Sequence, residues 1–161
     1  MIVLETERLL FREHEPDDLE PFCAMEADAE VRRWVGGRPR TREEAERKFR
    51  STYLKPPRGR RGMWATVLKA ENRYIGYCGV YGEGVLGYYL ARPYWGRGLA
   101  TEAARALIEF GFRELGLTRI TAAVEVGNEA SRHILEKLGF VHVRREAGEH
   151  RSFDHFVNSI G

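Results

Sequence analysis

The sequence has 161 residues, of which 43% are hydrophobic and 31% are charged, and its formal net charge is +2. This balance is typical of a globular protein with a buried core. The net charge is too small to indicate a nucleic-acid-binding or membrane-surface protein. We therefore expect a single domain over residues 1–161, with neither DNA nor a membrane as its partner.

The N-terminus and the cysteines narrow the class further. The apolar run Met1–Leu4 is interrupted by charges, so it predicts neither a signal peptide nor a membrane span. Cys23 and Cys78 lie in no CxxC or His-flanked pattern, which predicts free thiols and no metal site. These features favour a cytoplasmic protein.

The first third of the chain predicts one strand and two helices. Residues 8–13 are predicted to form the strand. Asp17 and Glu20 have the spacing of a capping box, which indicates a helix start there. A second box at 41–44 predicts a polar helix that ends near Leu54. The segments between and after these helices, 34–37 and 56–62, are predicted to be loops because of their Gly and Pro content.

Three strands are predicted next, and their short spacing favours antiparallel hairpins. They cover Trp64–Lys69, Tyr74–Tyr81 and Val85–Ala91, with turns at 71–73 and 82–84.

The last third alternates helices with strands. Apolar residues at helical spacing predict a helix over Leu99–Leu115, and Gly116 ends it. The remaining elements are a strand, a helix and two strands, at Thr118–Val126, Glu129–Leu138, Phe140–Arg145 and Ser152–Ser159. The order βααβββαβαββ predicts an α+β fold, with a mixed, mostly antiparallel sheet flanked by helices.

The turn at residues 94–101 is the clearest candidate site. The helix beginning at Leu99 follows Gly96-Arg97-Gly98 and has no Ser, Thr, Asp or Asn before it to cap its free N–H groups. Gly98 leaves room against the backbone, so these N–H groups and the helix dipole can receive an anion, with Thr101 adding a hydroxyl. A tight turn without a ligand is the alternative. The sequence lacks the P-loop and GxGxxG spacings, which excludes a kinase or ATPase motif here.

Two blocks carry a resemblance to a known family. The run Tyr88–Ala103, which ends in Trp-Gly-Arg-Gly-Leu-Ala-Thr-Glu-Ala, resembles the acetyl-CoA signature of the GNAT acetyltransferases. It is most similar to the ribosomal-protein N-terminal acetyltransferase (RimJ/RimL-like) branch. The run Asn128–Phe140 resembles the second block of the family, and Glu7–Arg12 is similar to the usual start of the branch.

The resemblance implies a GNAT fold in which two splayed strands, ending at Ala91 and Val126, form a slot for acetyl-CoA. The strand backbone at Tyr89, Leu90 and Ala91 would pair with the pantetheine arm. Asn128 would contact the cofactor or position the following helix. The pyrophosphate would bind N–H groups of the turn, at Gly96, Arg97, Gly98, Leu99, Ala100 and Thr101.

Two positions depart from the broader family. Trp95 stands where Gln or Arg is usual, and we expect it to pack under the turn. Leu135 stands where the family often has a tyrosine that acts as general acid, and a leucine cannot donate a proton. Any general acid must therefore come from another residue.

The resemblance implies direct attack of a neutral amine on the thioester, with backbone N–H groups near Leu90 facing the oxyanion. Ser131 is our candidate for the group that faces the departing thiolate and also contacts the cofactor. Its alternative role is to support the first turn of its helix. The base candidates are Glu125 and Glu83, although each is more often a solvated carboxylate. His14 and His133 titrate in a useful range, but surface histidines are commoner.

The acceptor side is marked by fewer residues. Tyr88 and Tyr89 alternate along a strand, so one is expected to line the slot and the other to pack in the core. Trp34, Arg38 and Arg40 lie in the segment that this family uses for acceptor specificity. The basic loop 58–61 could attract an acidic partner, although a solvated loop is the commoner explanation.

The sequence thus predicts an acetyl-CoA-dependent N-acetyltransferase acting on an amine, most similar to those that modify a protein N-terminal α-amine. Acetylation of a small amine, such as an aminoglycoside, polyamine or amino acid, is the alternative. A non-catalytic acyl-CoA-binding module is a third hypothesis. A homodimer is compatible with the sequence.

Overall fold

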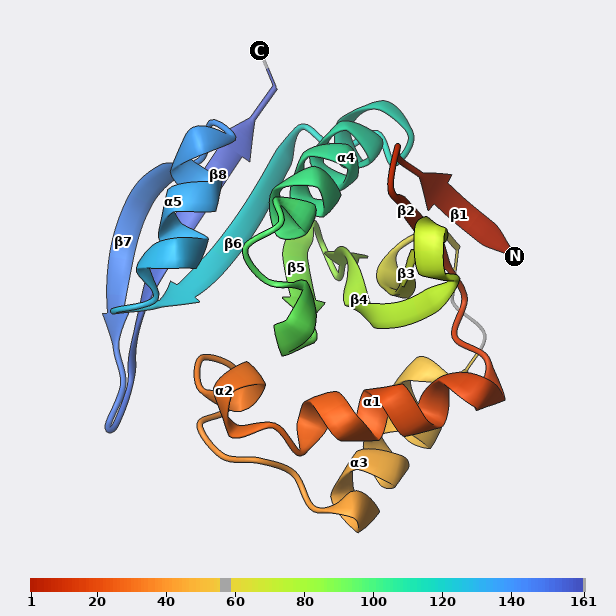
Figure 1. Ribbon diagram of the computed structural model, residues 1–161. Coiled ribbons are helices and arrows are strands. Elements are labelled where there is room, and N and C mark those ends of the chain that lie inside the picture. The colour runs from red at the N-terminus through yellow and green to blue at the C-terminus, as the bar shows by residue number, and fades with distance from the viewer. Residues whose placement is uncertain (56–58, 161) are drawn as a thin grey trace.

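The computed structural model of the protein describes residues 1–55 and 59–160. Within these residues, eight strands form one sheet in the order β1-β2-β3-β4-β5-β6-β8-β7 (Figure 1). All neighbouring strands are antiparallel except β5 and β6, so the predicted α+β class with a mixed, mostly antiparallel sheet is confirmed. The strands are β1 Ile2–Glu5, β2 Leu9–Arg12, β3 Gly62–Leu68, β4 Arg73–Tyr81, β5 Val85–Leu90, β6 Arg119–Glu125, β7 Val141–Ala147 and β8 Ser152–Ser159.

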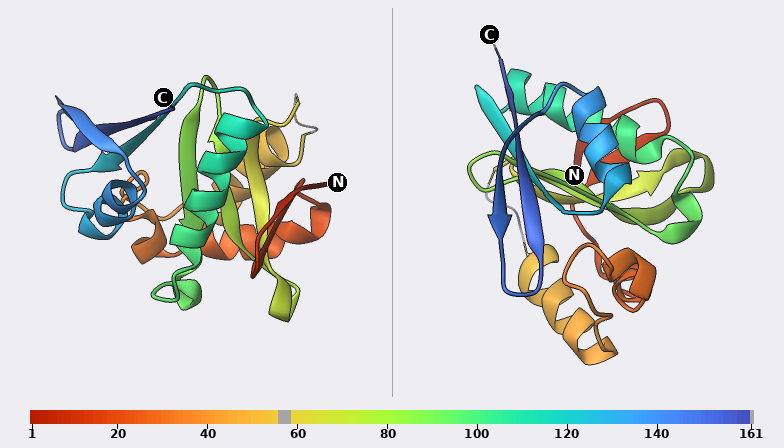
Figure 2. Two further views of the ribbon diagram at one scale, coloured as in Figure 1. Left: turned by 90° about the horizontal axis from the view of Figure 1, so that it is seen from above. Right: turned by 90° about the vertical axis from the view of Figure 1, so that its left-hand side faces the viewer.

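The helices cover both faces of the sheet (Figures 1 and 2). On one face lie α1, α2 and α3, and on the other lie α4 and α5. Their bounds are α1 Leu19–Glu26, α2 Ala29–Arg32, α3 Arg42–Lys48, α4 Leu99–Arg113 and α5 Glu129–Lys137. None of the helices in the described chain is long and apolar enough to cross a bilayer.

Each face of the sheet has its own hydrophobic core, because successive side chains of a strand point to opposite sides. Leu107 of α4 and Leu135 of α5 are fully buried in one core, and Phe22 of α1 is fully buried in the other. On β5, Tyr88 packs against the α4 core and Tyr89 packs against the α1 core. The two tyrosines alternate between the faces as predicted, but both line the cavity between β5 and β6.

The sheet opens between β5 and β6. In the part of the chain that the structure describes, these parallel strands are matched only at Val85 and Thr121, where the Thr121 N–H donates to the Gly84 carbonyl at 2.9 Å. In contrast, β6 pairs with β8 from Arg119 to Glu125. A gap therefore widens toward Leu90, as the resemblance implied.

The structure corrects two N-terminal predictions. A further strand, β1, precedes the predicted one and pairs with it. The capping box before α1 joins Glu15 with Asp18, not Asp17 with Glu20, and it opens a short 3-10 turn. The side chain of Asp18 is held by Arg12 at 2.8 Å, a tertiary contact that the local spacing does not reveal.

The second capping box, between Thr41 and Glu44, is confirmed at the start of α3. The helix continues as a π-helical turn over Phe49–Tyr53 and ends at Leu54, as predicted. The short α2 was not predicted, because four residues carry no helical periodicity. In the loop predicted over 56–62, residues 56–58 lie outside the described residues, and Gly62 begins β3.

Candidate active site

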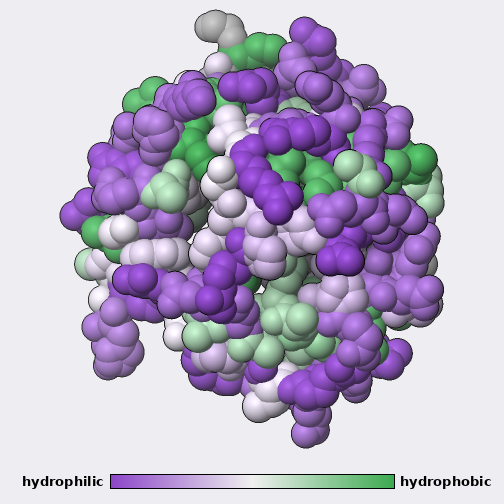
Figure 3. Space-filling model, in the orientation of Figure 1, coloured by the Kyte–Doolittle hydropathy of each residue, from purple (hydrophilic) through white to green (hydrophobic). Residues whose placement is uncertain are grey.

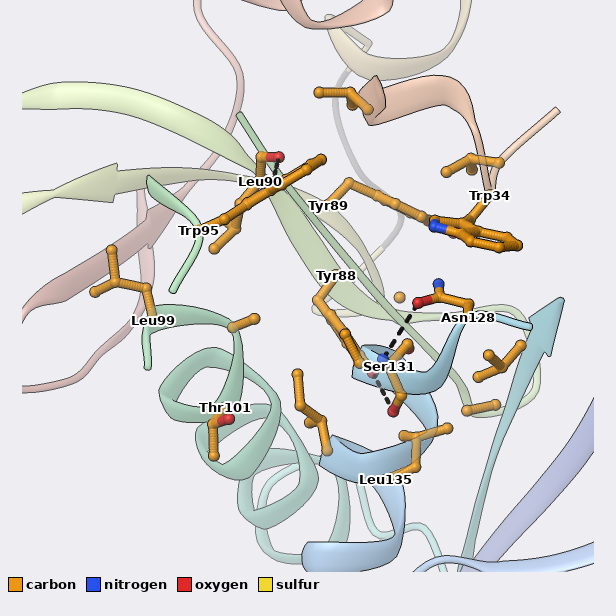
Figure 4. Close-up of a pocket in the computed structure, with 18 of the residues that line it drawn as sticks. Trp34, Tyr88, Tyr89, Leu90, Trp95, Leu99, Thr101, Asn128, Ser131 and Leu135 are labelled. Atoms are coloured by element: carbon orange, nitrogen blue, oxygen red, sulfur yellow. Dashed lines mark hydrogen bonds between the residues drawn. The ribbon is translucent and has the colours of Figure 1, made fainter. Parts of the chain in front are cut away.

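A cavity of about 460 Å³ runs through the gap between β5 and β6. On the face shown in Figure 3, hydrophilic residues cover most of the surface and apolar residues gather in hollows toward its middle. Figure 4 shows the cavity walls, which come from β5, the start of α4, the start of α5 and the loop after α2. Most predicted site residues line it, namely Tyr89, Leu90, Gly96, Gly98, Leu99, Ala100, Thr101, Glu125, Asn128 and Ser131. Ala91 and Arg97 do not line it.

The start of α4 has the geometry that the sequence predicts. Gly96 and Gly98 have φ angles of 73° and 76°, a region in which a side chain is strained. No side chain in the described chain caps the helix that begins at Leu99. The free N–H groups of its first turn lie beside the cavity, where the positive end of the helix dipole favours an anion.

Arg8 holds this turn from the other end of the chain, which the sequence reasoning did not predict. Its Nε donates to Glu102 of α4 at 2.7 Å, and its Nη1 donates to the Arg97 carbonyl at 2.9 Å. The Arg97 guanidinium lies over the Tyr94 ring. The backbone of Arg97 is therefore held by Arg8, and its side chain packs on Tyr94. The sequence signal that could have indicated this role is that Arg8 lies in Glu7–Arg12, the block similar to the usual start of the branch.

The pairing of β5 with β4 determines which of its backbone groups are free for a pantetheine arm. The Ala91 N–H donates to the Ile75 carbonyl at 2.8 Å, and Tyr89 is matched with Tyr77 of β4. Since backbone groups in an antiparallel strand alternate in direction, Tyr89 and Ala91 both face β4. Their polar backbone groups already have partners in the sheet.

The same alternation turns the backbone of Tyr88 and Leu90 toward the gap. Trp95 was expected to pack under the turn, and this prediction was wrong. Its side chain is 46% exposed, and its indole N–H donates to the Leu90 carbonyl at 2.8 Å (Figure 4). With its carbonyl engaged, Leu90 presents its N–H as a donor to the gap.

Tyr88, Ser131 and Asn128 form a hydrogen-bonded group across the cavity (Figure 4). The hydroxyls of Tyr88 and Ser131 are 2.7 Å apart, and Asn128 Oδ1 accepts from the Ser131 N–H at 3.3 Å as the cap of α5. Burial raises the pKa of Tyr88 to about 12, so its phenol stays protonated at neutral pH. Leu135, at the position of the family tyrosine, is fully buried.

The two carboxylates predicted as bases have different surroundings. Glu125 lines the cavity, but Arg151 donates to both of its oxygens, at 3.0 and 2.6 Å. This ion pair lowers the pKa of Glu125 and makes it a weaker base. Glu83 is exposed in the β4–β5 turn and does not line the cavity.

The two histidines also differ. His133 is exposed on α5, as expected of a surface histidine. His14 is buried, with its Nε2 3.1 Å from the Tyr74 hydroxyl, so the expectation of a surface position was wrong for it. Burial lowers the pKa of His14 to about 4, which leaves it neutral at pH 7.

The loop after α2 closes the far end of the cavity. The Trp34 ring lies against the Gly127 backbone of the β6–α5 loop, where an added Cβ would be 3.4 Å from the ring. Arg33 stacks on Trp34 at 4.8 Å. Arg38 and Arg40, predicted on the acceptor side, are instead engaged in ion pairs with Glu44 and Glu26.

Comparisons with known proteins agree with this geometry. The acetyltransferase (GNAT) domain model matches residues 8–141. The chain is 33% identical over 147 residues to the uncharacterized N-acetyltransferase p20 of Bacillus licheniformis, covering 87% of this chain and 83% of that protein. A shorter match is 45% identical over 51 residues to spermidine N(1)-acetyltransferase of Escherichia coli strain K12, covering 32% of this chain and 27% of that protein.

Two solved structures share the fold over 99% of this chain. A GNAT acetyltransferase from Bacillus anthracis superposes with a TM-score of 0.84, at 24% identity and 98% coverage of that chain. RimL, a ribosomal L7/L12 α-N-protein acetyltransferase in complex with coenzyme A, superposes with a TM-score of 0.82, at 16% identity and 98% coverage of that chain.

The fold, the split sheet and the family match define an acyltransferase that uses an acyl-CoA donor. The chain belongs to the GNAT family, and it is an acetyl-CoA-dependent N-acetyltransferase.

Proposed function

We propose that the acceptor is the α-amine at the N-terminus of a protein, as in the RimJ/RimL-like branch. The pairing of Glu125 with Arg151 carries this proposal. Among the described residues, two carboxylates line the cavity, and this ion pair neutralises the one on β6, while Glu30, the other, is exposed on α2. An α-amine titrates near ~8, so much of it is already neutral at cellular pH. A lysine-type amine titrates near ~10.4 and needs a stronger base. A polyamine would also need carboxylates, and Arg151 neutralises the one at Glu125.

The residues around the gap fit acetyl-CoA as the donor. The pantetheine arm would pair with the backbone of Tyr88, and the thioester carbonyl would accept from the Leu90 N–H, in place of the predicted pairing with Tyr89 and Ala91. The pyrophosphate would bind N–H groups at the start of α4, with Gly96 and Gly98 leaving space for it. Asn128 would act indirectly, because its side chain caps α5.

The proposed reaction is direct transfer. The neutral amine attacks the thioester carbonyl and forms a C–N bond, and the Leu90 N–H donates to the resulting oxyanion. Collapse of this intermediate breaks the C–S bond. The thiolate takes a proton from the Ser131 hydroxyl, which is replenished by Tyr88 at 2.7 Å, and the Tyr88 phenolate regains a proton from water. The surplus proton of the amine passes to water, and Glu125 accepts a hydrogen bond from the amine without deprotonating it.

A comparison of acceptors tests this proposal. We expect kcat/KM to be higher for peptides with a free N-terminal amine and no lysine than for spermidine or an aminoglycoside, with thiol release as the readout. N-acetylated versions of the same peptides serve as controls and should release no thiol above background. A preference for the polyamine or the aminoglycoside would contradict the proposal. Binding of acetyl-CoA without transfer to any amine would support the non-catalytic module.

A further inference from the structure

A second cavity, of about 510 Å³, lies beside the first and shares Tyr89 with it. Its lining includes Tyr53 after α3, Met63 of β3 and Tyr81 at the end of β4. Tyr53, Tyr77 and Tyr89 stack in series on the α1 face, with ring centroids 5.1 and 5.2 Å apart. The cavity therefore opens on the sheet face opposite α4, and it reaches the donor cleft at Tyr89.

The charges around this second cavity are mainly positive. Lys48, Lys55 and Arg61 line it, and none of the three forms an ion pair within residues 1–55 and 59–160. Glu13 is the carboxylate in the lining, and it faces the N-terminal amino group at 3.4 Å. Elsewhere, exposed arginines such as Arg42 are paired with carboxylates. The second cavity thus has a surplus of cations.

Its neutral polar groups add hydrogen-bond donors. Burial raises the pKa of Tyr53 to about 12 and also raises the pKa of Tyr89, so both phenols stay protonated at neutral pH. Trp64 is also in the lining, but its side chain packs in the core on the α4 face, so its indole N–H is not one of these donors. Carboxylates, which accept hydrogen bonds and carry negative charge, match this set of donors and cations.

We infer that this second cavity binds carboxylate groups of the acceptor and selects amines attached to an acidic segment. The inference rests on the proposed function, because it places the amine at the donor cleft. The acceptor chain would pass Tyr89, with its amine near Leu90 and its acidic side chains near Lys48 and Lys55. A polyamine would be repelled by the same cations.

Paired peptides test the selectivity. The wild-type enzyme should acetylate a peptide beginning Ser-Asp-Asp-Asp about tenfold more efficiently than one beginning Ser-Asn-Asn-Asn, mainly through a lower KM. The double variant Lys48→Met, Lys55→Met keeps the apolar stems and should lose most of this preference. Lys137→Met, an exposed lysine at the end of α5, is the control for net charge and should retain it. Equal kcat/KM for the two peptides in the wild type would overturn the inference.

A binding measurement separates this inference from the proposed function. Calorimetry with the N-acetylated acidic peptide requires no catalysis, and binding should weaken both with added salt and in the double variant. If this peptide binds but no peptide amine is acetylated, the α-amine proposal fails and the cavity assignment stands. Absence of binding would overturn the assignment. Free glutamate is tested as a further acceptor. Its acetylation with a kcat/KM equal to that of the acidic peptide would keep the cavity assignment and reject a protein acceptor.

Discussion

At the scale of single residues, the proposed mechanism makes the hydroxyl pair of Tyr88 and Ser131, 2.7 Å apart, the proton donor that Leu135 cannot be. Sequence reasoning reached Ser131 through the Asn-x-x-Ser pattern. It did not reach the phenol of Tyr88 as the partner, because that contact joins β5 to α5 across 43 residues of sequence. A role assigned to a family tyrosine can thus be carried by a tyrosine on a different element.

We expect Ser131→Ala to lower kcat by about tenfold to a hundredfold, with little change in the KM for acetyl-CoA. The physical reason is that the thiolate loses its proton donor while the donor-binding backbone is unchanged. Tyr88→Phe should give a smaller loss. Steady-state kinetics of both single variants and the double variant form a cycle, in which the double variant should be no worse than Ser131→Ala. Independent, additive losses would show that the two hydroxyls do not act together.

His14 gives the protein a pH-dependent stability. Its pKa is lowered from 6.5 to about 4 by burial, so the unfolded chain takes up a proton in this range and the native state does not. The stability associated with keeping His14 neutral is complete above pH 6.5 and is lost as the pH falls toward 4. Between pH 7 and pH 5 we expect a loss of about 2 kcal/mol in the free energy of unfolding, measured in urea.

His14→Phe should flatten this dependence, because no imidazole is then buried. His133→Gln changes an exposed histidine and should leave the wild-type dependence intact. If the pH dependence of stability persists in His14→Phe, other titratable groups must cause it.

At the scale of elements, the start of α4 joins backbone geometry to donor binding. Gly98→Val should raise the KM for acetyl-CoA about tenfold or more, because the side chain is strained at φ 76° and occupies space beside the free N–H groups. Gly116→Val is the matched control, since Gly116 also has a positive φ, of 67°, and lies at the far end of α4. Both variants should lose stability, but only Gly98→Val should lose donor affinity. Equal KM values for acetyl-CoA in the two variants would contradict the assignment of this turn to the donor site.

The elements also show what the sequence could predict. Helices α4 and α5 and strand β8 were placed within two residues, because their apolar periodicity and end signals are local. The backbone directions of Tyr89 and Ala91 could not be predicted, because they depend on how β5 pairs with β4, which the residue types do not encode. The contacts by which Arg8 stabilises the turn before α4 were also not predicted, because they are far apart in the sequence. Its contacts with Arg97 and Glu102 are separated by 89 and 94 residues.

At the scale of the whole molecule, two hydrophobic cores on opposite faces of one sheet meet at β5. Tyr88 belongs to the face that carries the donor helix α4, and Tyr89 belongs to the face that carries α1 to α3. A donor and an acceptor can therefore approach the same strand from different sides. Family resemblance pointed to the donor side, whereas the second cavity depends on the packing of the N-terminal helices and left no motif in the sequence.

The single match between β5 and β6 also makes the sheet incomplete. An acetyl-pantetheine arm bonded to the backbone of Tyr88 and, through its thioester carbonyl, to the Leu90 N–H would act as an inserted strand that joins two half-sheets, β1–β5 and β6–β8. Acetyl-CoA at a hundred times its Kd should then stabilise the fold by about 2.7 kcal/mol. Hydrogen exchange should slow most at the Tyr88 and Leu90 amides and little at Tyr89, which β4 already protects. Uniform slowing along β5 would contradict this pairing. The donor would then be a transient part of the protein's own architecture, and each turnover would remove it and replace it.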